Sequence, residues 1–265
     1  MRTCFSGLIG AGVMVVSATA ADLQIRFVYD GPPPKPEPVV ADRDREFCGA
    51  QGLIDESLLV HADNRGIRNV VLYVYTGRGG PKLPPLPKPP PSEVLLTAKG
   101  CRFEPHIVVA RAGDTLVFDP ADAVGHNLNI SFLRNNAQGI FVPAGAQRRI
   151  PLARSEPAPL PLECNIHPWM RGYLVLLDHS FVGVSDEDGR LEIKGLPDNT
   201  TLWFRVFHES ARLLAPIKQN GQPIDWPRNR LEVKLETGVQ DLGTIMVAPQ
   251  VLHKQEAAGK LPAEK

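Results

Sequence analysis

The sequence has no net charge, because 29 lysine and arginine residues balance 29 aspartate and glutamate residues. This balance gives no electrostatic reason to expect nucleic acid or an anionic membrane as a partner. Apolar residues at helical spacing are nearly absent after the first twenty residues, which argues against a mainly helical fold. No cluster of a nucleophile with an acid or a base stands out either. We therefore expect a protein that is not an enzyme.

The sequence does have many short stretches rich in valine, isoleucine, leucine and aromatic residues, each bounded by glycine, proline, asparagine or aspartate. This pattern is typical of the strands of a β-sandwich. The length of 265 residues is enough for two ordinary domains. Many of the 26 prolines lie in residues 31–38 and 81–91, which predict an extended loop and a semi-rigid spacer. The fold class expected is all-β, with two sandwiches.

Residues 1–20 have the pattern of an export signal. Arg2 precedes an apolar run over residues 5–16, and Ala18-Thr19-Ala20 provides the small residues that come before a signal-peptide cleavage site. The alternative is an uncleaved membrane anchor, but the apolar run is short for a bilayer span. No other segment of the sequence is apolar enough to cross a membrane. The sequence thus predicts a periplasmic or secreted protein.

An exported protein meets an oxidising environment, where cysteines are expected to pair. Removal of the signal would take Cys4 away and leave three cysteines, an odd number. Cys164 lies in a metal-ligand pattern, which nominates Cys48 and Cys101 as the disulfide partners. The alternative is that Cys164 is a buried thiol without a ligand role. A disulfide between positions 48 and 101 would stabilise the fold by about 4 kcal/mol on the chain-entropy model.

One short motif contains three kinds of side chain that bind metals, and its sequence is Cys164-Asn165-Ile166-His167-Pro168-Trp169-Met170. It places a thiolate, an imidazole and a thioether within seven residues. Upstream, His126 opens a strand-like run and supplies a second imidazole. Two imidazoles and a thiolate with a weak axial thioether are the ligand set of a blue-copper electron-transfer site. The pattern therefore predicts one type 1 copper ion, held by His126, Cys164, His167 and Met170.

Zinc is the main rival of copper at this motif, because cysteine and histidine bind zinc as well. A closed structural zinc site requires four strong ligands, and methionine is a poor fourth. The sequence has no second cysteine near Cys164, so the patterns of zinc fingers, disulfide oxidoreductases and thiolate-bridged dinuclear copper centres are missing. It also lacks a His-x-His pair, so the ligands of a trinuclear copper cluster are not visible.

Residues 94–178 resemble a cupredoxin, a blue copper protein of the amicyanin or plastocyanin type. The resemblance is carried by the ligand motif and by Cys101-Arg102-Phe103-Glu104-Pro105, Arg111-Ala112-Gly113-Asp114-Thr115-Leu116-Val117-Phe118 and Gly125-His126-Asn127. It implies a Greek-key sandwich in which the two histidines and Cys164 are equatorial ligands and Met170 is axial. The sequence departs from the family at residues 160–163, where Leu-Pro-Leu-Glu replaces the usual aromatic-rich strand.

The same resemblance implies a role for Asn127, and we expect two further neighbours beside the ligands, of which Trp169 could serve docking or simply pack. Asn127 would tie the two ligand segments together, and Pro168 and Trp169 would flank the site. His167 is the ligand expected nearest the surface, in an apolar patch with these two neighbours where a redox partner could dock. Outside the motif, His106 could be a further metal ligand or a structural histidine, and His208 could be functional or simply hydrogen-bonded.

Residues 184–197 resemble the second half of a carboxypeptidase regulatory-like, transthyretin-type sandwich. A strand suited to the first half, residues 66–74, lies before the cupredoxin-like stretch. We therefore expect a sandwich split around the copper domain, with a tandem order as the alternative. The expected boundaries are a signal over 1–20, a split sandwich over 22–80 plus 179–250, a linker over 81–92, a copper domain over 93–178 and a flexible tail over 251–265.

The function expected from these observations is one-electron transfer between redox partners through Cu(I) and Cu(II), with one copper ion per chain. A first alternative is a periplasmic copper carrier or store, in which the same ligands hold Cu(I) for delivery. A second alternative is an adhesion or scaffold protein with a structural metal site, a possibility to which the flanking sandwich lends weight.

Overall fold

The computed structural model describes residues 20–85, 89–211 and 214–252, and its regular structure is almost entirely strand. The all-β fold class predicted from the sequence is confirmed. The predicted signal lies outside the described residues except for Ala20, and so does the predicted tail beyond Leu252. Within the described ranges, no helix is both long and apolar enough to span a bilayer.

Nine consecutive strands form one sandwich, which we call the inner sandwich. These strands are β3 (Glu93–Ala98), β4 (Phe103–Glu104), β5 (Ile107–Arg111), β6 (Thr115–Phe118), β7 (His126–Ile130), β8 (Gln138–Val142), β9 (Arg148–Pro151), β10 (Leu160–Glu163) and β11 (Arg171–Leu177). One sheet has the order β5-β11-β10-β7-β8, and the other has the order β4-β3-β6-β9. Buried side chains of both sheets, among them Phe103, Phe118 and Leu128, pack into one core between them.

The second sandwich draws strands from both ends of the chain, and we call it the outer sandwich. Its strands are β1 (Ala20–Tyr29), β2 (Val71–Val74), β12 (Val182–Val184), β13 (Arg190–Pro197), β14 (Thr201–Phe207), β15 (Ile217–Gln219), β16 (Gln222–Ile224), β17 (Arg230–Lys234) and β18 (Gly238–Val247). Short 3-10 turns, η2 (Pro227–Asn229) and η3 (Pro249–Val251), follow β16 and β18. The two sheets have the orders β13-β1-β18-β15-β16 and β12-β2-β14-β17.

The two N-terminal strands occupy interior positions in the outer sandwich. β1 lies between β13 and β18, and β2 lies between β12 and β14. Burial along β1 largely alternates, because one face of the strand packs on the core. In the second sheet, Phe204 of β14 is paired with Val74 of β2. Strands that precede the inner sandwich in the sequence are thus paired with strands that follow it. The exact domain boundaries stay a prediction.

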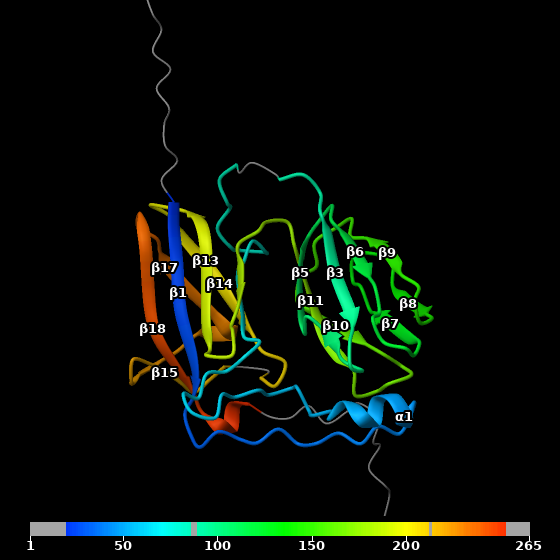
Figure 1. Cartoon of the computed structure of the whole chain (residues 1–265). Coiled ribbons are helices and arrows are strands. Elements are labelled where there is room, and N and C mark those ends of the chain that lie inside the picture. The colour runs from blue at the N-terminus through cyan, green and yellow to red at the C-terminus, as the bar shows by residue number, and fades with distance from the viewer. Residues whose placement is uncertain (1–19, 86–88, 212–213, 253–265) are drawn as a thin grey trace, which may run out of the picture.

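The two sandwiches lie side by side and share an apolar junction (Figure 1). Val71 and Tyr73 of β2 pack there with Tyr173 and Val175 of β11. The ring of Tyr173 also contacts Phe207, with 5.0 Å between the ring centroids. Aromatic pairs of this kind contribute about 0.5–1.5 kcal/mol beyond the area that they bury.

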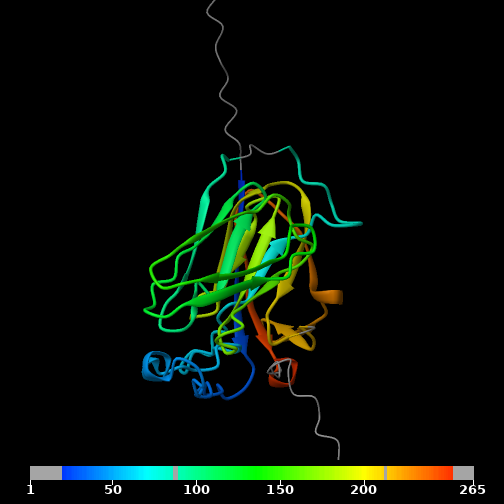
Figure 2. The same ribbon diagram turned by 90° about the vertical axis from the view of Figure 1, so that its right-hand side faces the viewer.

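Residues 37–55 form a loop that we call the strap. The strap contains α1 (Arg45–Cys48) and the 3-10 turn η1 (Gly49–Gln51). A hydrogen bond from the amide of Val39 to the carbonyl of Leu53 closes its base. Figures 1 and 2 show that α1 lies against one end of the inner sandwich, although the strap precedes that sandwich in the chain.

The apolar side chains of the strap belong to the core of the inner sandwich. Ala41, Cys48 and Leu53 are buried in that core, and Phe47 packs against it. Cys48 also forms a disulfide with Cys101, which lies between β3 and β4. The expected split sandwich over 22–80 plus 179–250 therefore includes a stretch that packs against the other sandwich.

Candidate metal centre

Two neighbouring strands of the inner sandwich bring the predicted ligands together. His126 is the first residue of β7, and Cys164 directly follows β10. β10 pairs with β7 through Leu162 and Ile130, which places the end of one strand beside the start of the other. The stretch 160–163, where the sequence departs from the cupredoxin pattern, is thus still a strand that leads into the cysteine.

The ligand motif is a tight loop between β10 and β11. The amide of Met170 donates to the carbonyl of His167 at 2.8 Å, and the amide of Cys164 donates to the carbonyl of Met170 at 3.3 Å. These bonds fold seven residues back on themselves, so that Cys164, His167 and Met170 are all buried. Pro168 is exposed and Trp169 is half-buried.

Three donor atoms converge at this loop. The Sγ atom of Cys164 lies 3.7 Å from Nδ1 of His167, and that nitrogen lies 3.2 Å from Nδ1 of His126. Both histidines have an exposed fraction of 0%, and Cys164 is 2% exposed. Among the described residues, these three form the one group of three or more histidine, cysteine or acidic side chains with converging donor atoms.

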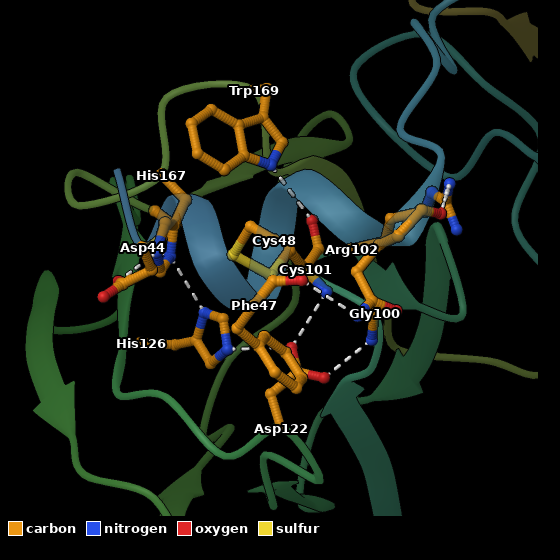
Figure 3. Close-up of a disulfide and its surroundings, with 12 residues drawn as sticks. Asp44, Phe47, Cys48, Gly100, Cys101, Arg102, Asp122, His126, His167 and Trp169 are labelled. Atoms are coloured by element: carbon orange, nitrogen blue, oxygen red, sulfur yellow. Dashed lines mark hydrogen bonds and ion pairs between the residues drawn. A yellow bond between two sulfur atoms is a disulfide. The ribbon is translucent and has the colours of Figure 1, made fainter. Parts of the chain in front are cut away.

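A carboxylate contacts each histidine on the side of the ring that faces away from the other donor atoms. Nε2 of His126 donates to Oδ2 of Asp122 at 2.9 Å, and Nε2 of His167 donates to Oδ2 of Asp44 at 2.7 Å (Figure 3). A carboxylate accepts but does not donate, so these bonds place a ring proton on each Nε2. They leave each Nδ1 as the nitrogen that faces the other donors. Carboxylates on the outer nitrogen of metal-binding histidines fix the ring orientation in the same way.

The site also favours the thiolate form of Cys164. Burial alone raises the pKa of this thiol, but its hydrogen bonds with His126, with His167 and with the amide of Asn127 outweigh burial and lower the pKa to about 6. The amide of Asn127 lies 3.3 Å from Sγ. Burial lowers the pKa of His167, but its hydrogen bonds with Cys164 and Asp44 more than compensate, so the pKa is raised. The cysteine can therefore ionise at neutral pH.

The spacing of the three donors fits a single metal ion. Bonds of about 2.0 Å to imidazole nitrogen and about 2.3 Å to thiolate are usual for a small divalent ion. With such bonds, the observed separations of 3.2 Å and 3.7 Å correspond to angles of roughly 100° and 115° at the metal. Those angles suit a tetrahedral or trigonal ion. The thiolate and the neighbouring thioether favour copper among such ions.

The structure brings three of the predicted site residues together, His126, Cys164 and His167, and it differs from one expectation. His167 was expected nearest the surface, and it is instead fully buried. The reason is the strap, which places Asp44 over the outer edge of the ring. The half-buried Trp169 packs beside this ring, with 5.2 Å between the ring centroids, and its Nε1 donates to the carbonyl of Cys101 at 3.2 Å.

Two important residues of the site are not part of the motif. Asp122 precedes His126 by four residues, so its proximity to that histidine could have been suspected from the sequence. Asp44 is more than 120 residues from His167 in the chain, and its only sequence signal is its position four residues before Cys48. Asn127 connects the two ligand segments through two hydrogen bonds. Its backbone amide donates to Sγ of Cys164 at 3.3 Å, and its side-chain oxygen accepts a longer bond from the amide of Asn165, at 3.5 Å.

The two remaining candidate histidines lie at the junction of the sandwiches. Nε2 of His106 lies 2.5 Å from Oε1 of Glu209. His208 is buried, and its Nε2 donates to the carbonyl of Arg68 at 3.3 Å. Burial lowers the pKa of His208 to about 4. Neither histidine belongs to the three-donor group.

No protein-family model and no curated protein sequence matches this chain. Among solved structures, a variant of amicyanin in the reduced Cu(I) form is 21% identical with a TM-score of 0.29, and the match covers 32% of this chain and 81% of that one. An oxidised amicyanin variant is 19% identical with a TM-score of 0.28, covering 31% and 80%. The copper-containing nitrite reductase of Thermus scotoductus SA-01 is 20% identical with a TM-score of 0.29, covering 38% of this chain and only 25% of that protein. Likenesses this weak identify no function.

Proposed function

We propose that His126, Cys164 and His167, with Met170 as a weak fourth ligand, bind one copper ion, and that the protein transfers single electrons between redox partners. The observation that carries the proposal is the convergence of a low-pKa thiolate and two Nδ1 atoms in a buried site. Bound copper would supply the one-electron couple between Cu(I) and Cu(II). Soft sulfur favours Cu(I), and imidazole serves both oxidation states.

The residues of the chain supply what such a couple requires. Asp44 and Asp122 hold the two imidazoles in place, and the amide of Asn127 directs a hydrogen bond at the thiolate. The β10–β11 pairing fixes both ends of the ligand loop. A cage that is held this firmly changes little when an electron arrives or leaves. The buried donors also keep water away from the metal.

We propose an electron carrier rather than an enzyme, because catalytic metal sites keep a coordination position open for substrate. Here one strand and one loop supply four candidate ligands, which would leave no position open for substrate. The three ligands with converging donor atoms are all buried. We further propose that the protein is exported to the periplasm or secreted. The Cys48–Cys101 disulfide supports export, since such bonds persist in oxidising compartments.

A visible spectrum of the copper-loaded protein tests the copper assignment. The oxidised protein should be intensely blue or green, because of charge transfer from the thiolate of Cys164 to copper. Cys164→Ser should abolish the colour and keep the fold, whereas Met170→Leu should keep the colour and shift the reduction potential. A wild-type protein that binds copper and stays colourless after oxidation contradicts the type 1 assignment.

The copper-carrier alternative is tested with a Cu(I) chelator. The burial of all three donors favours retention of the metal, so the loaded protein should cycle between oxidation states many times without loss of copper. Rapid release of Cu(I) to a chelator would instead favour the role of a copper carrier. A scaffold role would be favoured if copper bound but did not exchange electrons with any small-molecule reductant.

A further inference from the structure

We propose that the strap is a working part of the metal centre, and that Asp44 is the positioning residue that holds His167 as an Nδ1 ligand and covers its outer edge. This inference rests on the proposed copper function. Asp44 does not touch the three donor atoms of the site directly, because its carboxylate reaches only the far nitrogen of the His167 ring.

The first observation is the direction of the Asp44 carboxylate. Asp44 occupies the N-cap of α1, a position where an aspartate usually accepts hydrogen bonds from the first turn of the helix. Here its side chain makes no capping bond and instead accepts the Nε2–H of His167 at 2.7 Å. Its backbone is left-handed, with φ of 43° and ψ of 45°, a conformation that is uncommon outside glycine. The carboxylate is therefore directed to the histidine rather than to the helix.

The second observation is that the strap is fixed in place on several sides. The Cys48–Cys101 disulfide lies four residues after Asp44. A guanidinium nitrogen of Arg102 donates to the carbonyl of Gly52 at 2.9 Å, near the other end of the strap. Leu53 and Ala41 are buried in the inner core. A segment held in this way can keep one carboxylate at a constant position over His167.

The third observation is that the same disulfide connects the supports of both histidines. Asp122 accepts hydrogen bonds from the amides of Gly100 and Cys101, at 2.6 Å and 2.9 Å, and also from His126. Cys101 in turn is bonded to Cys48 in the strap. Figure 3 shows this chain of contacts from one ligand to the other. The two outer carboxylates thus belong to one cross-linked unit.

The consequence for the metal site is a closed outer face. A histidine whose outer nitrogen reaches the solvent can swing out of the site and release the metal. His167 has no such freedom, because Asp44 occupies its outer nitrogen and the ring is fully buried. A redox partner that approaches this end of the molecule therefore meets the charged strap, in which residues 42–46 are all exposed, rather than the histidine ring.

The test uses three full-length variants and two independent readouts. Asp44→Ala removes the carboxylate, Asp44→Glu restores it on a longer side chain, and Asp42→Ala is the matched control on an exposed position of the same strap. The first readout is the nitrogen-resolved NMR signal of the His167 ring in the copper-free protein. The second is the rate at which a Cu(I) chelator removes copper from the loaded protein, together with the reduction potential.

The wild-type and Asp42→Ala proteins should show an Nε2–H of His167 that is protected from solvent exchange. Asp44→Ala should lose that protection, release copper about 10–100-fold faster, and have a higher reduction potential because a negative charge near the metal is gone. Asp44→Glu should recover part of each effect. A protected Nε2–H signal and an unchanged release rate in Asp44→Ala would overturn the proposal. If the wild-type protein binds no copper, the proposed function fails, and the NMR signal still decides the role of Asp44.

Discussion

The Nε2 atom of His106 lies 2.5 Å from the Oε1 atom of Glu209, so a side chain of the inner sandwich is paired with a side chain of the outer one. Nδ1 of the same ring lies 4.0 Å from Oε2 of Glu56. Burial lowers the pKa of His106, but the hydrogen bond with Glu209 and the negative charges of both glutamates outweigh it, and the pKa is raised. A histidine at the junction therefore titrates differently in the folded and unfolded chain.

This pair predicts a pH-dependent stability. Because the folded-state pKa of His106 is raised, its stabilising contribution is fully present below its unfolded pKa of about 6.5 and is lost as the pH rises through the folded value. His106→Gln should therefore lower the free energy of unfolding most at acidic pH, by about 3 kcal/mol. Urea unfolding of both proteins across a pH series measures the difference. A difference that stays constant with pH would contradict the prediction.

Taking this difference between two proteins removes the titrating groups that do not interact with His106. His208, with a pKa lowered to about 4, contributes in the opposite sense, because its stabilisation is lost as the pH falls. That contribution is present in both proteins, so the difference retains only the part that depends on the charge of His106. Glu209→Gln provides a second check, since it keeps a hydrogen-bonding side chain and removes the charge. It should flatten the pH dependence in the same way.

The thiol of Cys164 should titrate well below an ordinary cysteine. In the copper-free protein we expect half of it to be thiolate at a pH of about 6, because its hydrogen bonds with both histidines and with the amide of Asn127 outweigh burial. The ultraviolet absorbance of the thiolate follows this titration, and Cys164→Ser gives the blank. Among the described residues the other two cysteines are in the disulfide and do not contribute. A midpoint near 9 would show that these hydrogen bonds do not form in solution.

Removal of the disulfide should loosen the strap and weaken the fold together. The double variant Cys48→Ser, Cys101→Ser opens a loop that spans 53 residues, which should lower the free energy of unfolding by about 4 kcal/mol. Equilibrium denaturation measures this loss. Copper should also leave the variant faster, because Asp44 loses its covalent anchor. If stability fell and copper release stayed at the wild-type rate, the strap would be structural only.

The outer sandwich should fold without the inner one, but only when both of its halves are present. The amide of Val74 donates to the carbonyl of Phe181 at 3.0 Å, so β2 and β12 are antiparallel neighbours that a short turn could join. A chain in which a Gly-Ser turn connects residue 76 to residue 179 should fold as a monomer once Phe47, Cys48 and Leu53 of the strap, which pack on the deleted sandwich, are replaced by serine. The fragment 179–250 alone should aggregate, because β13 and β18 lose the strand between them.

Circular dichroism and gel filtration distinguish these two outcomes. The fragment 94–178 provides the complementary test, because it keeps all four proposed ligands. We expect it to fold and bind copper more weakly, since it lacks the strap and exposes Tyr173 and Val175 of the junction. A well-folded, monomeric 179–250 fragment would restore the tandem order of domains.

Sequence reasoning succeeded where the relevant contacts are local. Cys164 and His167 are three residues apart, so their spacing alone predicts that their side chains lie close together, as the structure shows. His126 could be proposed from its residue type and its place at the start of a strand, but its position depends on the pairing of β7 with β10, which brings it to the loop. The burial of His167 could not be predicted in this way. It depends on the strap, whose position follows from a disulfide and from apolar packing that join segments far apart in the sequence.

The pairing of β1 has a consequence for the order of events during synthesis. Ala21 of β1 pairs in parallel with Gly238 of β18, a separation of 217 residues. The first strand to leave the ribosome must therefore wait for the last one before its sheet can close. The nine strands from β3 to β11 wait less long, because their most distant pairing, Ile107 of β5 with Tyr173 of β11, spans 66 residues. The inner sandwich can therefore fold while β1 still lacks both of its neighbouring strands, and until then both edges of β1 are unpaired.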